Sequence, residues 1–205
     1  MLRLILLGGT LSMGFWSFGQ SKEERFWKWF QAHDDPLFAV KSGQEPICSE
    51  LSAELERIHP NLVWQFGPIR SGKREFVLSA DGIKEAFPSV MSLASNAPQL
   101  SHWTIVRFRQ PHPDVTRVKI GGVELDARTV EFLPTKEGEV TDLTISVPGY
   151  NGTQSGAYDQ AVYLLLDGMV GEYTVETKVG AIQVISSENR PNGHWMPLTR
   201  LSDSI

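Results

Sequence analysis

Apolar residues in the first quarter of the chain recur at helical spacing. Ser21 and Glu24 have the spacing of a capping box, and the aromatic-rich run after them predicts a helix over 22–33. Pro46 suits the first turn of a second helix, which ends before Pro60. Its apolar stripe consists of Ile47, Leu51, Leu55 and Ile58. Each pattern indicates a helix that buries one face in a core.

Beyond residue 61 the apolar positions alternate, which predicts strands joined by short turns. The predicted strands are 62–66, 75–79, 102–109, 117–120, 123–126, 128–133, 142–147, 172–177 and 180–185. Two further helices are predicted, one that begins near Pro88 and ends at Ala97 and one from Ala157 to Met169. Because hairpin-length connections dominate, we expect an α+β fold with a mainly antiparallel sheet and helices packed on one face.

Length and composition are those of an ordinary globular protein. The chain has 205 residues, of which 41% are hydrophobic and 21% charged, so it can build a core without disulfides. No long linker or repeat divides residues 20–205, and we expect them to form a single domain with a loose tail from Asn189 onward. The formal net charge of −5 argues against a protein that coats nucleic acid or anionic lipid.

Residues 1–19 have the layout of a secretory signal peptide. Arg3 provides a positive start, the residues after it carry no charge, and Ser17 and Gly19 are the small residues expected before a cut at Gln20. This pattern favours a cleaved signal over an uncleaved anchor or an ordinary N-terminal strand or helix. Cleavage would leave 186 residues with a net charge of −6. We therefore predict a periplasmic or secreted protein with no stable membrane span, or a cytoplasmic one if the segment is not a signal.

The sequence contains no pattern that points to a metal or a cofactor. Cys48 is the single cysteine, which excludes an internal disulfide and a zinc site of several cysteines. Its place on a predicted helix favours a buried, inert thiol, with pairing between two chains as the alternative. The five histidines are scattered singly, and the common hydrolase, zinc-protease and nucleotide-binding motifs are missing. We expect neither a metal nor a cofactor.

One candidate binding face lies on the strand predicted over 102–109. Strand alternation places Trp103, Arg107 and Arg109 on the same face, where two guanidinium groups side by side would suit a carboxylate or phosphate. Pairing with acidic residues of a neighbouring strand, such as Glu131, is the simpler explanation of these arginines.

Asp81 and Glu172 are the candidate catalytic pair. Each carboxylate stands beside a glycine in a predicted turn between a helix and a strand, and two such groups brought together would suit general acid and base catalysis. The turn chemistry of Asp-Gly and of glycines at helix ends explains the same residues without catalysis, and we favour that explanation.

Several short motifs together resemble an uncharacterised bacterial domain family, a domain of unknown function. The residues that carry the resemblance are Phe26-Trp27-x-Trp29-Phe30, His59-Pro60-x-Leu62, Phe76-Val77-Leu78-Ser79-Ala80-Asp81-Gly82, Ala97-Pro98, Trp103, Phe108-Arg109-Gln110-Pro111, Leu165-Leu166-Asp167 and Gly171-Glu172. Some domains of this kind look to be fused to a module similar to a ribonuclease E inhibitor. The resemblance implies a regulatory or interaction role and supplies no catalytic residues.

These observations favour an exported, non-catalytic domain that binds a protein partner or a small ligand. A hydrolase that uses Asp81 and Glu172 is the first alternative. An inhibitor or immunity-type protein, whose acidic surface meets a basic partner, is the second.

Overall fold

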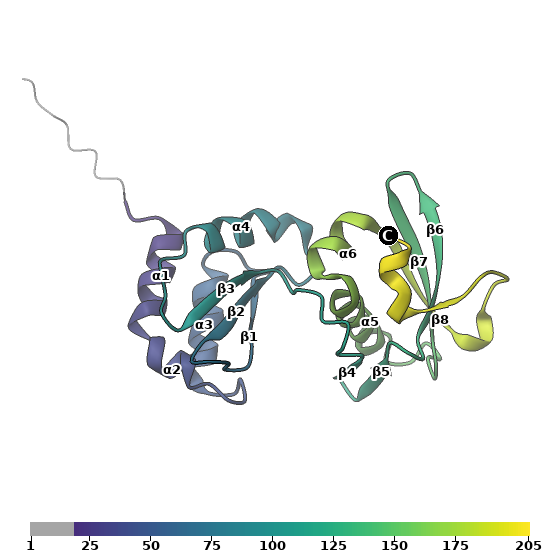
Figure 1. The fold of residues 1–205 in the computed structure, drawn as a ribbon, viewed down its shortest axis with the longest axis horizontal. Coiled ribbons are helices and arrows are strands. Elements are labelled where there is room, and N and C mark those ends of the chain that lie inside the picture. Colours follow the sequence, from purple (N-terminus) through teal and green to yellow (C-terminus); the bar gives the residue numbers. More distant parts are fainter. Residues whose placement is uncertain (1–18) are drawn as a thin grey trace, which may run out of the picture.

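The computed structural model of the protein describes residues 19–205, which fold into two lobes, each built around a sheet of its own (Figure 1). The predicted signal peptide lies outside these residues except for Gly19. Within the described part, no helix is long and apolar enough to cross a bilayer. The two lobes have separate apolar cores, one formed by residues 26–108 and one by residues 118–205. Whether 20–205 behave as a single domain stays a prediction.

The first lobe is a three-stranded sheet covered by helices. Its elements are α1 (Lys22–Ala32), α2 (Asp34–Phe38), α3 (Pro46–Glu56), β1 (Val63–Phe66), β2 (Arg74–Ser79), the 3₁₀ turn η1 (Lys84–Ala86), α4 (Phe87–Ser95) and β3 (Trp103–Arg107). Strand β2 lies in the centre, antiparallel to β1 and parallel to β3. The parallel pairing requires a crossover, which η1 and α4 provide.

Alternation along β2 gives the first sheet one buried face and one open face. Phe76 and Leu78 are fully buried, and the Phe76 ring stacks on Phe30 of α1 at a centroid distance of 4.9 Å. Glu75 and its cross-strand neighbour Thr104 lie on the other face and are exposed. The predicted aromatic helix therefore anchors the core, and the opposite face of the sheet is available to form part of a site.

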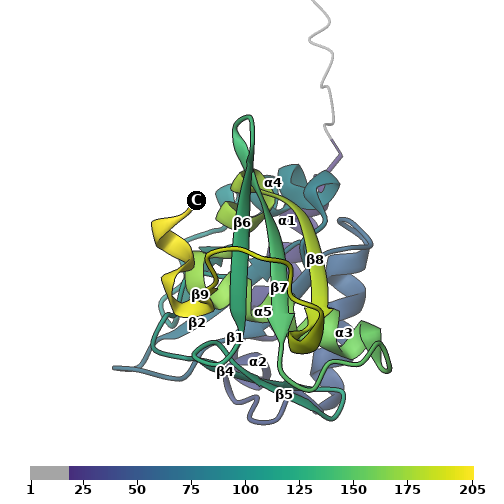
Figure 2. The same cartoon turned by 90° about the vertical axis from the view of Figure 1, so that its right-hand side faces the viewer.

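The second lobe carries the remaining strands. Its elements are β4 (Arg117–Ile120), β5 (Val123–Asp126), β6 (Glu131–Glu137), β7 (Val140–Val147), α5 (Ser155–Val170), α6 (Glu172–Lys178), β8 (Val179–Ser186), η2 (Ser187–Asn189), β9 (Met196–Pro197) and η3 (Leu198–Asp203). Strands β4 and β5 form a hairpin, and the larger sheet has the order β8-β7-β6-β9. Figure 2 shows the segment between β8 and β9 crossing the outer face of this sheet.

The α+β class is confirmed, with antiparallel pairings outnumbering parallel ones in the described sheets. The strands form three sheets, however, where one was expected. The predicted strand over 172–177 is wrong, because this segment is helix α6. Gly171 at φ 86° ends α5 and lets α6 begin at the next residue, and the amides of Thr174 and Val175 donate to the Gly171 carbonyl.

The prediction of a loose C-terminal tail is also wrong. Met196 and Pro197 pair with β6, and the η3 turn after them places Leu198 and Leu201 in the core of the second lobe, where both are fully buried. Two leucines three residues apart lie on one side of a 3₁₀ helix, so a short turn is enough to bury both. The segment lacks strand or α-helical periodicity, which is why the sequence pattern gave no sign of it.

Candidate functional site

The two lobes meet at a buried carboxylate. Glu172, the first residue of α6, has no exposed surface, and its two oxygens accept hydrogen bonds from two backbone amides of the first lobe and its outgoing segment. The amide of Ala80 donates to Oε1 at 2.9 Å, and the amide of Arg109 donates to Oε2 at 3.0 Å. Hydrogen bonds from amides to a charged acceptor are about twice as strong as neutral ones. One side chain of the second lobe thus holds the backbone just after β2 and just after β3.

The segment after β3 is fastened to the corner between α5 and α6 by further contacts. The Glu172 amide donates to the Arg109 carbonyl at 3.0 Å, and the His112 amide donates to the Gly168 carbonyl at 2.7 Å. Gly171 is required at this corner, since a Cβ there would lie 3.1 Å from Pro111 Cδ in addition to the positive φ. The connecting segment between the lobes is therefore held in place along its length.

The side chain of Arg109 joins acidic residues of both lobes. Nη2 donates to Asp81 Oδ1 at 2.7 Å, and Nη1 donates to Asp167 Oδ2 of α5 at 3.3 Å. Asp81 is half exposed, whereas Asp167 is 6% exposed. Glu172 accepts a hydrogen bond from the backbone amide of the same arginine, and we call Asp81, Arg109, Asp167 and Glu172 the junction cluster.

The junction cluster holds more acid than one guanidinium can neutralise, and the titration of Asp167 reflects this. The pKa of Asp167 is raised to about 7. Burial is the largest cause, the Arg109 guanidinium partly offsets it, and the neighbouring Glu172 and Glu176 carboxylates add to the rise. Burial and the Glu172 carboxylate also raise the pKa of Glu176. Asp167 is thus a buried carboxyl that changes charge near neutral pH.

Asp81 and Glu172, predicted from sequence as a pair, do converge on the same junction. They meet through Arg109, which binds Asp81 with its side chain and Glu172 with its amide. Both carboxylates thereby act as hydrogen-bond acceptors that hold the two lobes together. Arg109 does pair with acidic residues, but they lie in a turn and in helix α5 rather than on a neighbouring strand, and Glu131 pairs with Arg190.

The expected shared face of Trp103, Arg107 and Arg109 forms only in part: Trp103 and Arg107 alternate onto the helix-covered face of the sheet, in register with Arg74 and Leu78 of β2, and Arg109 does not join them. Trp103 is buried, with its indole N–H donated to Asp34 Oδ1 at 2.5 Å, and Arg107 is exposed with Nη1 near the Met91 sulfur. Arg109 leaves this face because Phe108 adopts φ 62° and ends the strand alternation after Arg107. That turn directs Phe108 into the core against Phe87, at a ring distance of 4.4 Å, and sends Arg109 towards the junction.

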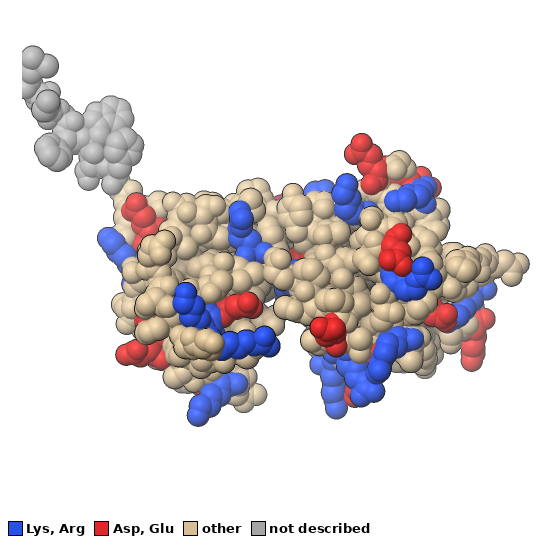
Figure 3. Space-filling view, in the orientation of Figure 1, with Lys and Arg blue, Asp and Glu red and all other residues tan. Residues whose placement is uncertain are grey.

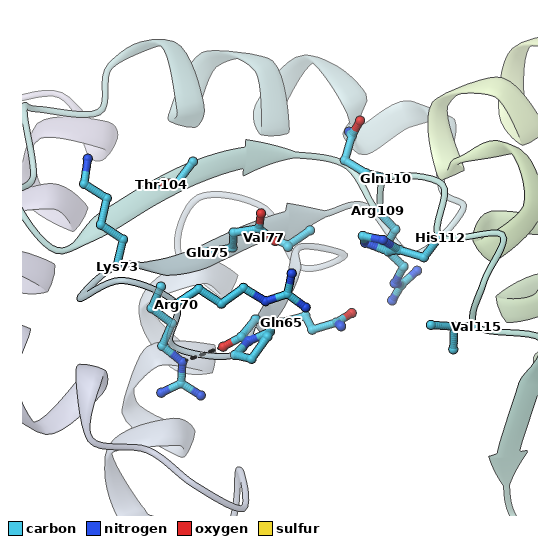
Figure 4. A pocket seen from close by; sticks show the side chains of 13 residues that line it. Gln65, Arg70, Lys73, Glu75, Val77, Thr104, Arg109, Gln110, His112 and Val115 are labelled. Carbon is cyan, nitrogen blue, oxygen red and sulfur yellow. Dashed lines mark hydrogen bonds between the residues drawn. The ribbon is translucent and has the colours of Figure 1, made fainter.

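A hollow of about 550 Å³ lies on the open face of the first sheet and reaches to the segment that joins the lobes. Its lining residues are Gln65, Gly67, Pro68, Arg70, Lys73, Arg74, Glu75, Val77, Thr104, Arg109, Gln110, His112 and Val115. Figure 4 shows Lys73 at one end and Arg109, Gln110 and His112 at the other, with Glu75 and Val77 of β2 between them. On the face drawn in Figure 3, Lys and Arg side chains stand on both lobes beside the notch that separates them.

The positively charged side chains that line the hollow differ in the contacts they make within the protein. Arg74 is buried and donates to the carbonyls of Gly67, Phe38 and Val40, so it serves the fold of the first lobe. Arg70 and Lys73, on the turn between β1 and β2, make no ion pair with any described residue. These two exposed cations are available to a ligand. The short basic run from Arg70 to Arg74 is the one feature of the sequence that points to them, and it was not among the predicted site residues.

Within the described residues no group of three or more histidine, cysteine or carboxylate side chains is arranged to hold a metal ion. Cys48 is buried, as predicted, and its pKa is raised by burial and by the Glu45 carboxylate. A raised pKa disfavours the reactive thiolate, which agrees with the expectation of an inert thiol.

The raised pKa of Asp167 predicts a pH-dependent loss of stability. Because the folded protein binds this proton more tightly than the unfolded chain does, the stabilisation is present at acid pH and is lost as pH rises from about 4 to about 7. Asp167→Asn cannot ionise, so over this range the wild type should lose roughly 2–4 kcal/mol relative to the variant. Urea unfolding at a series of pH values measures the difference. Asp159→Asn, an exposed position on the same helix, should follow the wild type, and parallel curves for Asp167→Asn would contradict the assignment.

Comparison with known proteins adds no family to this picture. No protein-family model matches the chain, and neither the curated proteins nor the solved structures contain a match. The resemblance drawn from the short motifs therefore stays a prediction, and the site has to be interpreted from its own geometry.

Proposed function

We propose that the protein is an exported, non-catalytic binding domain that holds a small anionic ligand in the hollow beside the first sheet. The observation that carries this proposal is the pair Arg70 and Lys73, two cations that line one cavity and have no acidic partner among the described residues. Guanidinium and ammonium groups bind carboxylates and phosphates through charge-assisted hydrogen bonds. A volume of about 550 Å³ suits a small molecule.

The polar groups that line the hollow support the proposal that it binds a specific ligand. Gln65 and Thr104 come from the two edge strands of the sheet, and Gln110 and His112 come from the segment that joins the lobes. Their amide, hydroxyl and imidazole groups can both donate and accept hydrogen bonds. Val77 provides a small apolar surface between them. A few convergent polar groups beside apolar surface are typical of ligand sites.

The alternative of a hydrolase that uses Asp81 and Glu172 draws less support from the geometry. A general acid or base must come within hydrogen-bonding reach of the substrate. Glu172 is fully buried and both of its oxygens accept backbone amides, while Asp81 is bound to the Arg109 guanidinium. The lining of the hollow includes neither residue. Binding without catalysis is the function that these contacts favour.

Charge substitutions in the hollow should change anion affinity in opposite directions. Sulfate is a suitable probe, and calorimetric titration should give a dissociation constant for the wild type. Replacing Arg70 and Lys73 by Gln should weaken sulfate binding by roughly tenfold or more, because two nearby positive charges are removed. Glu75→Gln should strengthen binding by about threefold, because it removes a negative charge from the same cavity.

Lys136→Gln is the matched control for this titration, since it removes an exposed cation near the end of β6 in the second lobe. It should leave sulfate affinity unchanged. If the Arg70 and Lys73 variant binds sulfate as tightly as the wild type does, the hollow is not the anion site.

Export is tested separately at the N-terminus. We expect the protein recovered from the periplasm or medium of a bacterial host to begin at Gln20, because the segment before it has the layout of a cleaved signal. N-terminal sequencing of the purified protein makes the measurement. Recovery of the chain only from the cytoplasm, with Met1 at its start, would contradict export without affecting the anion site.

A further inference from the structure

Arg109 belongs both to the hollow and to the junction cluster. It lines the cavity with Gln110 and His112, and its guanidinium also holds Asp81 and Asp167. We propose, building on the proposed function, that anion binding in the hollow is coupled to proton uptake by Asp167. Ionised Asp167 offsets part of the positive charge that Arg109 contributes to the hollow, so protonation of Asp167 makes the whole cavity more favourable to an anion, including one held by Arg70 and Lys73 at the other end.

The geometry leaves Arg109 able to serve both sides. A guanidinium has five N–H donors in a planar fork, and the described carboxylates engage two of its nitrogens, one each. The side chain is 19% exposed, so it is largely withdrawn from water but still reaches the surface of the hollow. Its backbone is fixed by Glu172, which keeps the guanidinium between the lobes. A change in the charge balance around Arg109 is therefore felt in the cavity.

The charges around Asp167 set the direction of the coupling. Arg109 faces it from the segment between the lobes, and Glu172 and Glu176 face it from α6. Glu176 is in turn faced by Lys84 and Glu85 of η1, while Tyr163 of α5 is near Glu176. Acidic groups outnumber basic ones in this set, so the region attracts protons. Each proton bound there removes a negative charge that would repel an anion in the adjacent hollow.

The titration range fits this coupling. With its pKa raised to about 7, chiefly by burial, Asp167 is ionised above neutral pH and protonated below it. Lower pH should therefore strengthen anion binding, and, by thermodynamic reciprocity, anion binding should raise the proton affinity of Asp167. His112 lines the same cavity and is a second titratable group there. The test therefore uses a chain in which His112 is replaced by Gln.

The experiment is a calorimetric titration of sulfate into H112Q between about pH 5 and 8, repeated in buffers of different ionisation enthalpy. Sulfate keeps the same charge over this range, so changes in affinity report on the protein. We expect H112Q to bind sulfate at least about fivefold more tightly at the acid end and to take up protons on binding. H112Q/D167N should bind tightly at every pH without this proton uptake, and H112Q/D159N should behave as H112Q.

A second substitution keeps the test decisive if the Asp167→Asn chain folds poorly. Asp81 is half exposed and binds the same guanidinium. In the H112Q chain, Asp81→Asn leaves Arg109 more available to Asp167, so the midpoint of the pH dependence should move to lower pH. The coupling is overturned if D167N retains the full pH slope and proton uptake, or if D81N leaves the midpoint in place. Sulfate binding that depends on Arg70 and Lys73 but not on Asp167 would defeat the coupling alone, whereas failure of every variant to bind sulfate would defeat the anion site as well.

Discussion

The carboxylate of Glu172 is the contact on which the arrangement of the two lobes depends. A buried carboxylate without partners is costly, and two backbone amides that donate to it offset that cost. The amides belong to Ala80, which directly follows β2, and to Arg109, which lies two residues after the end of β3. Asp81 and Phe108, each adjacent to one of these donors, adopt positive φ. A bulky residue such as Phe108 persists in that region only where its surroundings hold it, and the carboxylate, together with the packing of the Phe108 ring, does so.

The position of the hollow follows from this junction. Phe108 turns the chain out of the sheet. The residues after it therefore no longer continue β3, and three of them form one end of the cavity: Arg109, Gln110 and His112. The opposite end is formed by the turn between β1 and β2, which carries Arg70 and Lys73. The sheet between them presents Glu75 and Thr104 outward because the alternate residues Phe76 and Leu78 are committed to the core. The site is therefore a consequence of how one sheet is packed and how its last strand is ended.

Local pattern was sufficient for most elements but insufficient at the points where the site is made. The spacing of Leu51 and Leu55 and the hairpin of β4 and β5 depend on neighbours in sequence, and both were predicted correctly. The segment 172–177 has an alternation that suits a strand, yet the helix wins because Gly171 allows a sharp turn and Glu172 reaches a partner more than sixty residues away. Strand alternation likewise could not foresee the turn at Phe108, which depends on packing against Phe87. The turn glycines drew attention to Asp81 and Glu172, but nothing local required the two to converge, and the role of Arg109 between them needed the fold.

The most direct test of this account is the hydrogen exchange of two backbone amides, those of Ala80 and Arg109, measured by NMR. If Glu172 holds both exits of the sheet, these amides should be protected in the wild-type protein. In E172Q, where one acceptor oxygen becomes an amide group, at least one of them should exchange faster, while the amide of Phe108, which donates to the Leu78 carbonyl, should keep more of its protection. Rapid exchange of both amides in the wild type, or unchanged protection in E172Q, would contradict the central role of this carboxylate.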